Sequence, residues 1–81
     1  MKKQKLIIES IQYITGLRES IKLQGKHKEL KAFRKVLNAS RNLYESLQKK
    51  NVTLQEIERL VDIKKRASIR FQQITGQSWP L

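Results

Sequence analysis

Apolar residues recur at spacings of three and four along most of this chain, and that period is the feature that most restricts its fold. An α-helix turns once in 3.6 residues, so a stripe with this spacing covers one face of a helix. A single proline and three glycines leave too few turn residues for an all-β fold. The pattern predicts an all-α protein. Its N-terminal stripe consists of Ile7, Ile11, Ile14, Leu17 and Ile21.

The first helix is expected over residues 3–23, with Gly25 as its stop signal. Gly16 lies within this range, where it costs up to about 1 kcal/mol relative to alanine. The alternative is a break at Gly16, with a second short helix that begins at Leu17. Either arrangement gives an amphipathic N-terminal region.

The second helix is expected over residues 27–49 and the third over residues 54–75. Thr53 and Glu56 fit a capping box, in which the N-cap residue is followed three positions later by a glutamate. Gly76 is expected to end the third helix. The whole chain, residues 1–81, is therefore predicted to be a single domain, a compact bundle of three to four amphipathic helices.

The core of such a bundle must be thin, because only 38% of the residues are hydrophobic and 6% are aromatic. Trp79 is expected to fold back onto the bundle as a lid. If its indole were exposed, the largest apolar side chain of the protein would contribute no buried surface to the core. The Ile-Thr-Gly sequence occurs twice, at residues 14–16 and 74–76, and predicts two similar helix ends. Apolar residues off the main stripes favour a homodimer that would bury them, namely Leu6, Ile8, Ile63 and Ile69.

Charge is the strongest indication of function. Eighteen Lys and Arg against seven Asp and Glu give a net charge of +11, more than half of it within residues 26–50. Such like charge destabilises a compact fold unless a polyanion neutralises it. The chain is therefore expected to bind nucleic acid, DNA in preference to RNA. The expected contacts are Lys28, Lys31, Arg34, Lys35 and Arg41 on the second helix, with Lys64, Lys65, Arg66, Ser68 and Arg70 on the third.

Residues 53–76 resemble the helix-turn-helix of bacterial and phage transcription regulators. In that interpretation residues 56–61 form the supporting helix, Asp62-Ile63 the turn and residues 64–73 the recognition helix. The resemblance implies that the basic N-terminus of the recognition helix meets phosphates and base edges. Glu58 and Asp62 depart from the pattern, which has a small residue and a glycine at these positions.

The alternative is one continuous helix over residues 54–75, in a plain antiparallel three-helix bundle. Its inward face would then be a coiled-coil-like seam that includes one lysine. The basic faces would contact backbone phosphates with little reading of sequence. The seam would consist of Ile57, Leu60, Lys64, Ala67, Phe71 and Ile74.

The sequence gives no indication of an enzyme. His27 has no cysteine or second histidine with which to form a metal site, and no phosphate-binding glycine loop or nucleophile elbow is present. No metal, cofactor or small-molecule substrate is expected. No stretch approaches the ~20 apolar residues of a membrane span. Lysines followed by the apolar residues 6–8 resemble the start of a signal peptide, but Glu9 ends this apolar segment after three residues. A cytoplasmic protein is therefore expected.

Two other functional classes fit the same features. In size, charge and helix pattern the chain resembles bacteriocin immunity proteins, which are cytoplasmic four-helix bundles acting at the inner membrane face. That resemblance implies peripheral contact between the basic surface and anionic lipid. The other class is a phage-type inhibitor or adaptor that binds an acidic protein. Nucleic acid remains the favoured partner because of the density of positive charge.

Overall fold

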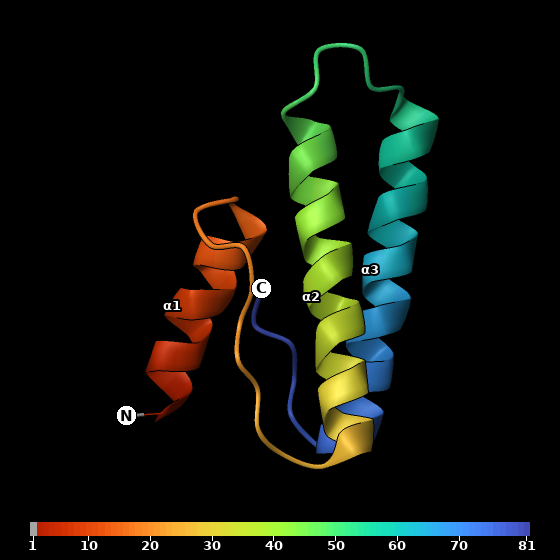
Figure 1. Ribbon diagram of the computed structural model, residues 1–81. Coiled ribbons are helices and arrows are strands. Elements are labelled where there is room, and N and C mark those ends of the chain that lie inside the picture. Colours follow the sequence, from red (N-terminus) through yellow and green to blue (C-terminus); the bar gives the residue numbers. More distant parts are fainter. Residues whose placement is uncertain (1) are drawn as a thin grey trace.

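The computed structural model describes residues 2–81, with side chains from residue 5 onward. Three helices make up most of this range: α1 (Lys2–Ile14), α2 (His27–Leu47) and α3 (Leu54–Thr75). Figure 1 shows α2 and α3 as a long antiparallel hairpin, with α1 beside one end of it and the C-terminal segment running between α1 and α2. The all-helical fold agrees with the sequence pattern.

Both ends of α3 follow from local chemistry. The backbone N–H of Glu56 donates to Thr53 Oγ1 at 3.2 Å, which caps the N-terminus. Gly76 adopts a left-handed conformation with φ 75°, and its N–H donates to the carbonyl of Gln72 at 2.8 Å. Between these caps the helix is unbroken through Asp62 and Ile63, where the helix-turn-helix interpretation required a turn. No glycine or proline interrupts this stretch, so nothing locally opposes the helix.

The first helix is shorter than expected. It ends at Ile14, and Gly16 turns the chain with φ 86°. The N–H of Leu17 donates to the carbonyl of Gln12 at 2.8 Å and that of Gly16 to Tyr13 at 3.2 Å, the bond pair of a Schellman motif. The expected helix over residues 3–23 is therefore wrong beyond Ile14.

Irregular chain follows over residues 15–26, so the second short helix expected from Leu17 is also absent. Leu17 is 82% exposed and supplies no packing for another turn of helix. Ile21 and Leu23 pack against the core without helical structure. Gly25, expected to stop the first helix, instead lies just before Lys26, the N-cap of α2.

The two Ile-Thr-Gly segments both end helices, as predicted. In each one the glycine has a positive φ, and the threonine hydroxyl donates to a carbonyl four residues earlier. Thr15 bonds to Ile11 at 2.9 Å and Thr75 to Phe71 at 2.7 Å. Each segment directs the following chain back towards the core.

The core lies where α2 meets both other helices. An aromatic cluster of Phe33, Phe71 and Trp79 forms its centre, with edge-to-face ring centroids 5.4–6.0 Å apart. The indole N–H of Trp79 donates to Ser40 Oγ at 3.1 Å. Trp79 therefore folds back as a lid, which confirms the expectation from sequence. The buried core residues are Ala32, Phe33, Val36, Leu37 and Phe71.

Apolar side chains remain exposed on both sides of this core. Ile8, Ile63 and Ile69 are exposed, whereas Leu6 packs against the core. At the far end of the hairpin Leu47 and Leu54 are also exposed. Figure 1 shows that the hairpin extends beyond the end of α1 there. The homodimer that would cover such residues stays a prediction.

Candidate nucleic-acid interface

An open groove of about 460 Å³ runs between α2 and α3. Two alanines explain it: Ala39 is buried and Ala67 half-buried, so the helices approach closely over small side chains. The residues beside the alanines are long, polar and exposed, and they form the walls of what we call the α2–α3 groove. It is lined by Lys35, Asn38, Ala39 and Asn42 of α2 and by Ile63, Arg66, Ala67 and Arg70 of α3.

The lining of the groove includes three cations and no acidic side chain: Lys35 from α2, with Arg66 and Arg70 from α3. All three are exposed. Helical spacing puts Lys28 and Lys31 on the same side of α2 as Lys35, because residues three, four and seven apart share a face. The positive charge therefore continues along α2 beyond the groove itself.

Arg66 forms an ion pair with Asp62, with Nε and Oδ2 3.1 Å apart. Their side chains are 80% and 53% exposed, and an ion pair between exposed groups contributes about 0–1 kcal/mol. A phosphate can therefore displace Asp62 at little cost. Over residues 5–81 the only other ion pair joins Arg41 to Glu45, so neither Lys35 nor Arg70 is neutralised by an acidic partner.

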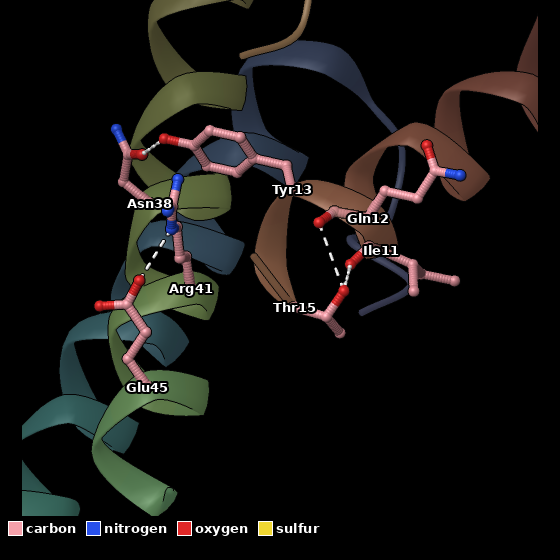
Figure 2. A network of polar contacts seen from close by, with 7 residues as sticks. All are labelled: Ile11, Gln12, Tyr13, Thr15, Asn38, Arg41 and Glu45. Atoms are coloured by element: carbon pink, nitrogen blue, oxygen red, sulfur yellow. Dashed lines mark hydrogen bonds and ion pairs between the residues drawn. The ribbon is translucent and has the colours of Figure 1, made fainter. Parts of the chain in front are cut away.

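A polar network ties α1 to α2 at the edge of the groove (Figure 2). The hydroxyl of Tyr13 donates to Asn38 Oδ1 at 2.7 Å, which leaves the NH₂ group of Asn38 available as a donor. The guanidinium of Arg41 lies over the Tyr13 ring, 4.6 Å from its centroid, and donates to Glu45 at 2.8 Å. The hydrogen bond to Glu45, followed by the interaction with Tyr13, raises the pKa of Arg41.

Arg41 was expected to contact nucleic acid, but it lies on the α1 side of α2 with its guanidinium engaged by Glu45 and Tyr13. Arg34 also faces that side, where it lines a small pocket with Tyr13 and Leu37. The structure therefore divides the predicted cations of α2 between two faces. Lys28, Lys31 and Lys35 are on the groove side.

The predicted cluster at residues 64–70 is divided in the same way. Because α3 is unbroken, these residues stand in the middle of a helix and not at an exposed N-terminus. Lys64 is half-buried, and its Nζ donates to the main-chain oxygen of Leu81 at 2.6 Å. Ser68 donates to the carbonyl of Lys64 at 2.8 Å, and Lys65 lies on the opposite side of α3 from the groove by helical spacing. Only Arg66 and Arg70 reach the groove.

Sequence reasoning missed the two amides of the groove. Asn38 and Asn42 are four residues apart and exposed, so they lie on one face of α2. The signal was their position on either side of Ala39, a small residue that marks close helix contact. Exposed amides of this kind add hydrogen-bond donors to a surface otherwise made of cations.

The described residues show no cluster of three or more His, Cys, Asp or Glu side chains suited to a metal ion. Within the same residues, none of the three helices combines the length and apolar character needed to cross a membrane. Comparison with protein-family models, curated proteins and solved structures gave no match to this chain.

Proposed function

We propose that the protein binds double-stranded nucleic acid, DNA in preference to RNA, through the phosphate backbone at the α2–α3 groove. The observation that carries this proposal is the convergence of Lys35, Arg66 and Arg70 on one open groove without an acidic lining residue. Phosphate contacts of this kind supply most of the sequence-independent affinity of DNA-binding proteins. Asn38 and Asn42 add donors to phosphate and sugar oxygens.

The aromatic residues favour a duplex over a single strand. Proteins that bind single strands stack bases on exposed aromatic rings. No aromatic residue lines the groove. Phe33, Phe71 and Trp79 form the core cluster, and Tyr13 is engaged by Asn38 and Arg41. Tyr44 is exposed but does not line the groove. The groove thus offers cations and amides but no aromatic ring on which a base could stack. Such side chains suit contacts to the phosphate backbone of a duplex.

The lack of a turn at Asp62 bears on the mode of binding. A helix-turn-helix presents the N-terminal end of its second helix to the major groove of DNA. Here α3 offers its side and not its end, and its cations act together with those of α2. We therefore expect contacts to the backbone and little discrimination between base sequences.

The test is a fluorescence-anisotropy titration of labelled duplex DNA over a range of salt concentrations, repeated with duplex RNA and with single-stranded DNA. We expect binding to duplex DNA with a slope of about −3 in log affinity against log salt, since each of three contacted phosphates releases about one counterion. Unlabelled duplex should compete, whereas anionic phospholipid vesicles should not. Absent or salt-independent binding to the duplexes would refute the proposal, as would preferential binding to vesicles.

A further inference from the structure

A second cavity lies on the other side of the core, between α1 and the C-terminal segment. It has a volume of about 400 Å³, within the range typical of small-molecule sites. Leu6, Ile7 and Ser10 of α1 form one wall, and the segment from Gln77 to Leu81 forms another. Such a space arises because α1 packs beside α2, with an irregular segment between them in place of a fourth helix (Figure 1).

The lining of this cavity is mainly apolar. Among residues 5–81, whose side chains the structure describes, no charged side chain lines it. Phe33, Phe71 and Trp79 all contribute to its walls, and their rings meet edge to face. A flat aromatic ligand would extend the same arrangement of rings. A charged ligand would lose its hydration without gaining a partner of opposite charge.

The polar groups of the lining indicate which hydrogen bond a ligand needs. Ser10 is only 2% exposed, and its hydroxyl donates to the carbonyl of Leu6 at 2.7 Å. The hydroxyl proton of Ser10 is therefore already used in a hydrogen bond, but its oxygen can still accept one. The indole N–H of Trp79 is also committed, to Ser40. Gln77 and Ser78 also line the cavity, but both are exposed to water, so Ser10 is its buried hydrogen-bond acceptor.

We propose that this cavity is a binding site for a neutral aromatic molecule that carries one N–H or O–H donor. The rings of the cluster contact the aromatic part of the ligand, and Ser10 Oγ accepts its hydrogen bond. The site is separate from the α2–α3 groove, because the two share no lining residue. Its existence does not depend on whether the groove binds nucleic acid.

The test uses N-phenyl-1-naphthylamine, a neutral fluorescent probe with a single N–H donor. Trp79, the only tryptophan, lines the cavity and reports directly on occupancy. We expect one probe per chain, with quenching of Trp79 emission and an affinity that does not change with salt. The sulfonated analogue 1-anilinonaphthalene-8-sulfonate should compete only weakly, because its charge finds no partner inside. Non-saturable binding, or no quenching of Trp79, would overturn the proposal.

Two neighbouring isoleucines provide a matched pair of variants. Ile7 lines the cavity and is 37% exposed, whereas Ile8 is 56% exposed and does not line it. Ile7→Phe should fill part of the space and weaken the probe at least about tenfold, while Ile8→Phe should leave its affinity within about twofold. Ser10→Ala removes the acceptor and should weaken the probe by about three- to tenfold.

Circular dichroism melting of each variant shows that it is folded before binding is compared. If Ile7→Phe does not fold, the probe affinity of Ser10→Ala tests the site instead, because this substitution only removes a hydroxyl group. Equal probe affinity in wild type, Ser10→Ala and Ile8→Phe would contradict the assigned site, even if the wild-type protein bound the probe.

Discussion

The two faces of α2 differ in what fills the space beside them. Towards α3, small residues such as Ala39 and Ala67 let two regular helices meet, and exposed cations surround the seam. Towards α1, the aromatic cluster meets an irregular segment that leaves a mainly apolar cavity, with no charged side chain in its lining among residues 5–81. The two faces of one helix thus line two different kinds of site, a basic groove and a mainly apolar cavity. Which side chains of α2 come together in each site depends on the segment that packs against that face.

Replacement of Trp79 should have the largest effect and should act on the cavity side. Trp79→Ala removes two edge-to-face ring contacts and the bond to Ser40. We expect a loss of about 3 kcal/mol in the free energy of unfolding, measured by urea titration with far-ultraviolet circular dichroism. At temperatures where the variant is folded, duplex affinity should stay near that of wild type. A fall in affinity comparable to that of a groove variant would show that the two faces are not independent.

A larger side chain at the base of the α2–α3 groove should have the next largest effect on stability. This change acts on the opposite face of α2 from Trp79. Ala67→Leu places a larger side chain where α2 and α3 meet, and overpacking of this kind costs about 1–3 kcal/mol. Separation of the helices should also weaken duplex binding, because Lys35 and Arg70 are held on different helices. Chemical denaturation and anisotropy would measure the two effects. An unchanged affinity together with reduced stability would indicate that the spacing of the groove is not important for binding.

The glycines at the two similar helix ends should have smaller effects. Gly16 and Gly76 have φ values of 86° and 75°, and a Cβ at either would meet no atom within 4 Å. Alanine therefore adds only backbone strain, about 1–2 kcal/mol at each position. Thermal melting of Gly16→Ala and Gly76→Ala should show similar losses. A much larger loss for one of them would mean that the two ends are not equivalent.

Loss of either i,i+4 ion pair should give the smallest change in stability, but the two replacements distinguish the two faces of α2. Asp62→Asn frees Arg66 in the groove, whereas Glu45→Gln frees Arg41 on the α1 side. Both should alter the unfolding free energy by less than about 1 kcal/mol. At low salt Asp62→Asn should raise duplex affinity about two- to fivefold, because Arg66 loses its competing carboxylate and a negative charge beside the groove is removed. An equal increase in Glu45→Gln would point to net charge and not to the groove.

Much of the fold was predictable because its signals are local. Thr53 caps the N-terminus of α3 with its side chain, and Gly76 ends the helix with its left-handed backbone. Both predictions are confirmed. Trp79 was correctly placed on the core, since a large apolar side chain has few alternatives. The end of α1 was not predicted, because the apolar spacing that continues to Ile21 cannot show that Leu17 has nothing to pack against.

The candidate site was only partly predictable. Charge density pointed to α2 and α3, but cations occur on several sides of both helices. Periodicity alone cannot show which side meets which neighbour, so Lys35 and Arg70 were grouped with Arg34 and Lys64. The apolar cavity left no signal in the sequence, from which no small-molecule partner was expected. It depends on how the C-terminal segment packs beside α1, which is a tertiary property.

The most direct test of the nucleic-acid proposal compares two triple variants of equal charge. Lys35→Ala with Arg66→Ala and Arg70→Ala removes the cations of the groove. A matched control removes three exposed lysines outside it, Lys22, Lys50 and Lys65, also by alanine.

Anisotropy with duplex DNA at one fixed salt concentration then separates the groove from the net charge. We predict that the groove variant binds about 100-fold more weakly than wild type, since each phosphate contact is worth on the order of 1 kcal/mol. The control should stay within about threefold, because screened and distant charges contribute little. Equal losses in the two variants would contradict the account and assign binding to overall charge.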